Sequence, residues 1–408
     1  MLAGAHGPVR QWAVRHQLAV GEFFDAADTV PVAQAHVMAD TESLGPSGVA
    51  WLEGLAASPA PERRVRVPTI TDPRGLDLAS YRRLGQTEAM ADLEVRAARA
   101  LEALGVLMTN TCINYQTILP PVRGEHLALG DTGVAIYSNS VMGARSNFEG
   151  GPSALAAGLT GRTPRYGYHL DEHRAGTCHL VVEPDVGPRD LADWGALGGI
   201  VGRIANSYWQ VPVVSGLERV PGSDELKHFG AALASFGSVA LFHMPGITPE
   251  AATIADAFHG RPVPPPVRIG SADLEAFYAT YAAKGDKVDV VVFAAPQLSL
   301  IEMSELAGLL DGRRVHADTT LFVSTSPEIK FAADRMGLTR KIEDAGGVVA
   351  SGVCFYQMYA REMGEANGWQ RLLTNSAKLV NIIAGYGYKP TLAGMQACVD
   401  SAVAGRIV

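Results

Sequence analysis

A short segment in the first half of the chain gathers residues suited to binding an anion. The sequence GARSNFEGGPSALAAGLTGRTP (residues 143–164) places Arg145 just before a Gly-Gly-Pro turn and a run of helix formers. Gly151 or its neighbour is expected to cap a helix from about Pro152 to Leu159, because proline fits a first helical turn. Free N–H groups at a helix start and an arginine fork both bind carboxylate or phosphate. The alternative is a tight helix crossing with surface arginines.

A second group of polar residues follows directly. HLDEHR (residues 169–174) contains two carboxylates, two imidazoles and a guanidinium, which suits a metal site or acid–base chemistry. A hydrogen-bonded network at a domain seam is the alternative, and it is favoured for His173. It is less favoured for His169, which alternates with Tyr166 and Tyr168.

The cysteines are few and widely spaced. No Cys-x-x-Cys pair is present, and this number does not make a disulfide framework. They are either buried core thiols or convergent metal ligands, which spacing alone does not decide. The cysteines are Cys112, Cys178, Cys354 and Cys398.

The last third of the chain alternates strand-like and helix-like segments, which predicts a parallel sheet covered by helices. Strands are expected within 288–294, 313–326 and 346–356. Ligands of such sheets bind beyond the carboxyl ends of the strands. That rule indicates the loops 295–299, 324–328 and 352–356.

We therefore expect an α/β protein of several lobes, with parallel sheets flanked by helices. The expected divisions are an N-terminal lobe (1–190), a middle region (191–284) with a proline-rich linker near 259–270, and a C-terminal βα lobe (285–408). The net charge of −8 and the lack of a basic run argue against nucleic acid as a partner. No apolar run approaches the ~20 residues that cross a bilayer, and no signal-peptide core is present, so we expect a cytoplasmic protein.

The segment YSNSVMGARSNFEGGPSALAAGLTGRTPRYGYHLDEHR (137–174) resembles the aconitase X family. Further stretches resemble the same family in the same order, so the resemblance covers nearly the whole chain. They are AQAHVMADTESLG (33–45), RVPTITDPRGLDL (66–78), TNTC (109–112), GEHLALGDTG (124–133), AAPQLSLIEM (294–303), VHADTTLFVSTS (315–326) and AGGVVASGVC (345–354).

The resemblance implies an aconitase-like architecture of α/β domains around a central cleft, with a fourth, swivelling domain either fused or separate. It implies a hydro-lyase acting on a small hydroxy-carboxylate such as a hydroxyproline-like acid, since members dehydrate cis-3-hydroxy-L-proline or phosphomevalonate. No stretch of this chain resembles the swivelling domain. We therefore expect a separate small swivelling subunit as a partner.

The resemblance also implies an iron or iron–sulfur centre held by three cysteines. Cys112 and Cys354 occupy two of those positions, whereas Ala295 stands at the third and Gln297 replaces the expected histidine. We expect the standard centre to be absent or atypical. The alternatives are a metal-free elimination, isomerisation or cyclisation, or a non-catalytic binding subunit.

Polar residues around these positions are expected to do the chemistry. An arginine and helix-end amides would hold the carboxylate, and a base would take the α-proton. The expected catalytic residues are Arg145, Asn147, Ser140, His169 and Asp171. The expected substrate-binding residues are Asn139, Ser146, Gly151, Ser153, Thr325 and Ser326.

Overall fold

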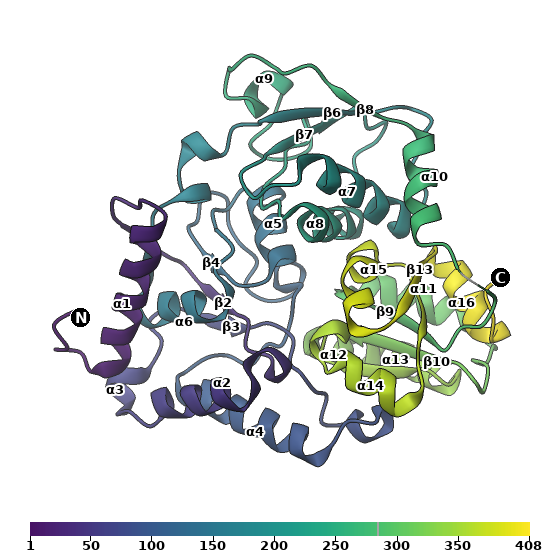
Figure 1. Cartoon of the computed structure of the whole chain (residues 1–408), viewed down its shortest axis with the longest axis horizontal. Helices are drawn as coiled ribbons and strands as arrows, with labels where there is room; N and C mark the ends of the chain where they lie inside the picture. Colours follow the sequence, from purple (N-terminus) through teal and green to yellow (C-terminus); the bar gives the residue numbers. More distant parts are fainter. Residues whose placement is uncertain (284) are drawn as a thin grey trace.

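The computed structural model describes residues 1–283 and 285–408, and its first region lies on the left of Figure 1 in purple and blue. A parallel sheet in the order β3 (Thr69–Thr71), β2 (Ala35–Val37), β4 (Ala128–Leu129) forms its centre. Helices pack around it: α1 (Pro8–Phe23), α2 (Thr41–Ala56), α3 (Ala60–Arg63), α4 (Glu88–Ala103) and α6 (Gly150–Thr160). An antiparallel pair, β1 (Thr29–Pro31) and β5 (Arg162–Pro164), joins the ends of this region.

The middle region, at the top of Figure 1, has a second parallel sheet in the order β7 (Pro212–Ser215), β6 (Cys178–Val182), β8 (Val267–Ile269). Its helices are α7 (Leu191–Ala205), α8 (Ser223–Gly237), α9 (Ile254–Ala257) and α10 (Ser271–Thr280). Because β6 belongs to this sheet, the middle region begins near Cys178 rather than after residue 190. The proline-rich stretch 259–270 does not separate two domains, since it contains β8, which pairs with β6.

The third region, on the right of Figure 1, has a five-stranded parallel sheet. Its order is β11 (Val348–Ser351), β10 (Thr320–Thr325), β9 (Val290–Leu298), β12 (Arg371–Thr374), β13 (Lys389–Leu392). Its helices are α11 (Leu300–Leu309), α12 (Pro327–Arg335), α13 (Leu338–Asp344), α14 (Ala360–Asn367), α15 (Ala377–Ile383) and α16 (Met395–Ala404). The three predicted strands are confirmed as β9, β10 and β11. All of β9 is buried, as expected of a central parallel strand.

The three regions meet around α5 (Thr132–Ser140) and α8. Helix α5 starts at the carboxyl end of β4 and packs on α8, which also contacts α15 of the third region. Hydrogen bonds join residues at the carboxyl ends of the first and third sheets: Lys378 to Asp131, and Gln297 to the Asn110 carbonyl. We name this buried junction the central cleft, after the architecture that the family resemblance implies.

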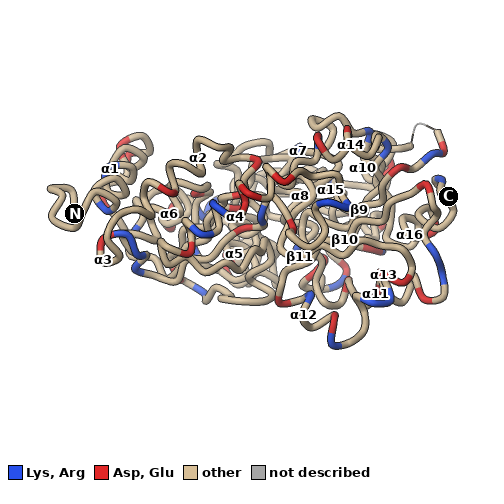
Figure 2. The backbone as a smooth tube through the Cα atoms, turned by 90° about the horizontal axis from the view of Figure 1, so that it is seen from below, with Lys and Arg blue, Asp and Glu red and all other residues tan. Residues whose placement is uncertain are grey.

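Charged residues are distributed over the whole molecule. Figure 2 shows basic and acidic positions interspersed from α1 at one end to α16 at the other. Among the described residues, no helix combines the length and the apolar character that crossing a membrane requires.

Candidate active site

The three loops predicted at the carboxyl ends of β9, β10 and β11 do meet, and the Gln297 side chain joins them. Its Nε2 donates to the carbonyl oxygens of Asn110 (3.1 Å), Thr325 (3.4 Å) and Val353 (3.2 Å). Its Oε1 accepts from the N–H of Cys112 at 3.3 Å. Gln297 is fully buried, so this amide ties the first region to the third at the floor of the cleft.

The structure brings the Cys112 and Cys354 thiols together, beside Gln297. The Cys354 thiol lowers the pKa of the Cys112 thiol by hydrogen bonding to it, and burial raises the pKa of Cys354 itself. The Cys112 sulfur also accepts from the Gln297 N–H at 3.5 Å. Ala295 belongs to the same buried apolar cluster as Cys354, and its carbonyl accepts from Ser376 Oγ at 2.6 Å. A methyl group thus occupies the expected third ligand position.

A buried ion pair lies next to the two thiols. Lys378 Nζ, in the first turn of α15, is 3.3 Å from the carboxylate of Asp131, which caps α5 by accepting from the Val134 N–H. Burial opposes the lysine charge, but Asp131 and the nearby thiols outweigh it, so the pKa of Lys378 is raised. Lys378 is therefore a permanent cation in the cleft.

Asp72 is a further buried acidic residue that the first region contributes to the cleft. It follows β3 directly; one carboxylate oxygen accepts from Gln357 at 2.9 Å, and the other has no hydrogen-bond partner among the described residues. Burial, and then repulsion from Asp131, raises the pKa of Asp72 well above its usual range. His36 Nε2 lies 3.6 Å from Asp72, and the His36 Nδ1 atom has no hydrogen-bond partner in the part of the chain that the structure describes. Such orphan polar atoms mark a place where a ligand or water binds.

The expected residues Arg145, His169 and Asp171 form a separate cluster. Arg145 donates to the carbonyl of His169 at 3.2 Å and pairs with the Asp171 carboxylate. The Arg145 hydrogen bond lowers the pKa of Asp171. The two Nδ1 atoms of His169 and His126 are 2.9 Å apart, and burial lowers the pKa of His126 to about 4.

This cluster reaches from one end of β4 to the other. Arg145 pairs with His126 just before β4, whereas Asp131 follows β4. His169 Nε2 lies 3.9 Å from Glu149 Oε1, and the Glu149 N–H donates to the Leu129 carbonyl at the carboxyl end of β4. Among the described residues, no hydrogen bond joins Arg145 to Cys112 or Cys354.

Four further expected residues hold backbone groups in place. Asn139 bonds both the N–H and the carbonyl of Ser146 (each 2.8 Å), and Ser146 Oγ accepts from the Leu129 N–H at 3.0 Å. Ser140 Oγ accepts from the Phe242 N–H at 2.9 Å. Asn147 donates to the Tyr166 carbonyl and accepts from the Tyr168 N–H, at 3.1 and 3.0 Å. All four side chains are buried.

The helix after the glycine pair begins slightly earlier than expected, at Gly150, and Glu149 is its N-cap residue. Gly151 packs against the chain after β2, since a Cβ there would lie 2.5 Å from the Met38 carbonyl oxygen. Ser153 Oγ is 2.8 Å from His16 Nε2. This helix start adjoins the carboxyl end of β4, because the Glu149 N–H donates to the Leu129 carbonyl.

Thr325 and Ser326 lie at the cleft but use their hydroxyls locally. Thr325 Oγ1 donates to the Leu298 carbonyl at 2.7 Å, and Ser326 Oγ caps α12 by accepting from the Ile329 N–H at 3.2 Å. Both are fully buried. They shape the loops after β9 and β10 around Gln297.

Four residues of the cleft were not predicted from the sequence: Lys378, Asp131, Asp72 and His36. Three of them lie inside segments that carry the family resemblance, and each follows or lies in a strand of the first sheet. Lys378 follows β12, so the rule of carboxyl strand ends would have indicated it. The RLLT strand was missed because it is only four residues long.

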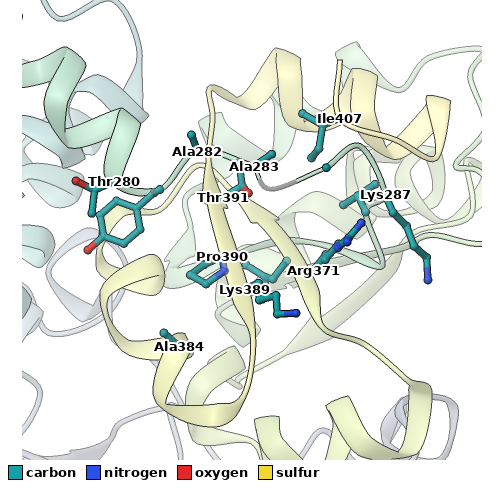
Figure 3. A pocket seen from close by; sticks show the side chains of 14 residues that line it. Thr280, Ala282, Ala283, Lys287, Arg371, Ala384, Lys389, Pro390, Thr391 and Ile407 are labelled. Atoms are coloured by element: carbon teal, nitrogen blue, oxygen red, sulfur yellow. The ribbon is translucent and has the colours of Figure 1, made fainter.

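Two surface cavities help to locate the site. One of about 330 Å³ (Figure 3) is lined by Arg371 and Lys389, the first residues of β12 and β13, and so lies at the amino ends of the strands. Parallel sheets bind ligands at the other end. A second cavity, of about 440 Å³, is lined by Arg74, Asn110 and Gly352. It adjoins the two cysteine loops and therefore the central cleft.

Comparison with known proteins agrees with this arrangement. Models of the aconitase X first, second and third domains match residues 1–172, 176–279 and 288–404. The phosphomevalonate dehydratase large subunit of Methanothermobacter thermautotrophicus is 35% identical over 98% of this chain and 94% of that one. The cis-3-hydroxy-L-proline dehydratase of Pseudomonas aeruginosa is 32% identical over 100% of this chain and 69% of that one. The crystal structure of Thermococcus kodakaraensis aconitase X (holo-form) has a TM-score of 0.86 and 28% identity, covering 98% of this chain and 97% of that one.

Three parallel-sheet regions around a buried, charged cleft define an aconitase-like α/β enzyme. The chain belongs to the aconitase X family, as its motifs predicted. It is an enzyme of the lyase class, an aconitase X-like dehydratase.

Proposed function

We propose that this chain is the large subunit of a hydro-lyase that removes water from a small hydroxy-carboxylate, and that the substrate resembles hydroxyproline. The observation that carries the proposal is the buried group of Lys378, Asp131 and Asp72 at the carboxyl ends of strands from two sheets. Sites of α/β enzymes form at such ends. Charged groups are kept buried and incompletely paired where function requires them.

These groups suit an elimination of water. The reaction transfers a proton from the carbon next to the carboxylate to a basic group of the site, and the neighbouring hydroxyl group takes up a proton and leaves as water. Lys378, as a permanent cation, stabilises the negative charge that develops on the carboxylate. Burial raises the pKa of Asp72 well above its usual range, so this carboxyl group is suited to give a proton to the departing oxygen.

An unpartnered carboxyl oxygen favours a substrate that carries an amine. Among the described residues, the buried Asp40 keeps one carboxyl oxygen without a hydrogen-bond partner. That oxygen suits the amine of a hydroxyproline-like acid.

We also infer a separate small subunit. Relatives that this chain matches over most of their length are named large subunits. A lid over the cleft excludes water from the reaction, and a swivelling subunit would provide one. Co-purification from the native host tests this: we expect a second small protein in a stable complex. Full activity of the chain eluting alone at monomer size would contradict it.

The substrate proposal is tested by turnover of the complex with a panel of acids, followed by NMR. We expect loss of water from cis-3-hydroxy-L-proline or a close cyclic analogue, and exchange of its α-proton with solvent deuterium. Phosphomevalonate should remain unchanged. Dehydration of phosphomevalonate, with the hydroxyprolines left intact, would contradict the proposed substrate class.

A further inference from the structure

The residues at the expected metal position do not fit a three-thiolate iron centre. Two sulfurs, Cys112 and Cys354, are present, but the third position is the methyl group of Ala295. Among the described residues, no group of three or more His, Cys, Asp or Glu side chains is arranged to hold a metal ion. A metal–thiolate site loses affinity sharply when one ligand is missing.

Gln297 also occupies the space between the two cysteine loops. Its amide bonds the carbonyls of Asn110 and Val353, which lie two residues before Cys112 and one residue before Cys354. None of its side-chain polar atoms is left without a partner among the described residues. A cluster between these loops would have to displace a fully buried, fully bonded side chain, which is costly.

Lys378 provides a positive charge at the same place. Its ammonium has three donors, and in the described part of the chain it makes one hydrogen bond, to Asp131 at 3.3 Å. The ring of Tyr356, 5.5 Å from Nζ, covers another side. Lys378 is 4% exposed, so water does not solvate the remaining donors freely. A buried ammonium with free donors is prepared to bind an anion.

We propose that this enzyme works without the iron centre of its family and that Lys378 binds the carboxylate of the substrate in its place. The inference rests on the proposed function for the identity of that carboxylate. The ammonium and the substrate carboxylate form a charge-assisted hydrogen bond in a water-poor cleft, where such bonds are strong. Asp131 holds the ammonium in position from the other side.

The first test is metal content. The chain, with its partner if one co-purifies, is prepared without oxygen and incubated with ferrous iron and sulfide. After removal of excess metal, we expect iron far below one atom per chain and no visible absorption band of a cluster. Stoichiometric iron that is lost in Cys112→Ser would overturn the proposal.

The second test is binding of pyrrole-2-carboxylate, a planar cyclic acid, measured by calorimetry. We expect Lys378→Met to weaken binding by about tenfold or more, as for loss of a charged hydrogen bond. Lys389→Met is the matched control, because Lys389 is exposed at the amino end of β13, and should bind like the wild type. The double variant Asp131→Asn/Lys378→Met removes both charges, so it keeps the test valid if the single variant does not fold.

The outcomes separate the two proposals. Unchanged affinity in a folded Lys378 variant would overturn the role of Lys378 and leave the dehydratase proposal standing. Absence of binding by the wild-type complex, together with no turnover of any hydroxyproline, would contradict both.

Discussion

The Asp131 side chain has two roles: it caps α5, and it pairs with Lys378. Asp131→Asn keeps the cap, since asparagine caps helices as well as aspartate. It leaves the Lys378 charge buried and unpaired, so we expect a loss of about 3–5 kcal/mol in the free energy of unfolding. Denaturant unfolding measures this. Asp190→Asn, at the cap of α7, is the control and should change stability by less than about 1 kcal/mol.

Glu42 gives a prediction about pH. It lies in the first turn of α2 and accepts from the Tyr359 N–H of the third region. Burial raises the pKa of Glu42 from 4.5 to about 7. Between those values the folded state binds a proton that the unfolded state releases, so stability falls as pH rises through that window and stays level above it.

Glu42→Gln removes this dependence. Between about pH 5 and about pH 8, the melting temperature of the wild type should fall more than that of the variant. Glu53→Gln on the same helix is the control, because Glu53 pairs with Arg96 at the surface. It should melt with the wild-type pH dependence. Parallel curves for wild type and Glu42→Gln would exclude Glu42 as the titrating group.

The sequence first predicted that Arg145 binds the carboxylate of the substrate. The contacts of Arg145 to His169 and Asp171 favour a structural role. Lysine keeps the charge but loses the planar fork. We expect Arg145→Lys to lower the melting temperature and leave the affinity for pyrrole-2-carboxylate unchanged. Weaker binding at unchanged stability would show instead that Arg145 binds the substrate carboxylate.

The sequence shows at which positions this chain departs from the family. It does not show which other residues take over the chemistry of the missing cysteine and histidine. Ala295 and Gln297 are visible by comparison with the motif. Lys378 and Asp131 lie far apart in the sequence and become partners only when α15 meets α5 across two regions. The role of the polar residues near Arg145 stays a prediction, because a buried asparagine or serine serves backbone hydrogen bonds as readily as a ligand.

At the scale of elements, the crossing of α7 and α8 depends on glycine. A Cβ at Gly198 would lie 2.2 Å from the Phe229 carbonyl oxygen, so the helices would have to separate. We expect Gly198→Ala to destabilise the protein by about 1–3 kcal/mol. Gly54 lies in α2, and no atom of the described residues lies within 4 Å of its Cβ position, so Gly54→Ala should instead stabilise the protein by up to about 1 kcal/mol. Thermal and denaturant unfolding of the two variants measure the difference. Equal effects would show that the crossing tolerates a methyl group.

Strands were predictable where long β-branched runs are buried on both faces. That holds for the third region, where VVVF and LFV form β9 and β10. The middle sheet was not predicted, because β8 is three residues long and lies within a proline-rich stretch. There the pairing with β6 decides the structure, and local composition pointed to a linker instead.

In the molecule as a whole, the proposed reaction takes place where the three regions meet. The first region contributes Asp72 and Asp131, and the third contributes Gln297 and Lys378. The middle region supports them through α8, whose Lys227 bonds the Gln297 carbonyl at 3.2 Å. A ligand bound in the cleft should therefore hold the regions together and raise the melting temperature of the protein.

The most direct test of this account is a crystal structure of the enzyme with pyrrole-2-carboxylate. We predict the carboxylate within hydrogen-bond distance of Lys378 Nζ, between Asp72 and the Gln297 loop. A ligand bound beside Arg145 and His169, or in the cavity at Arg371 and Lys389, would contradict the assignment of the cleft as the active site.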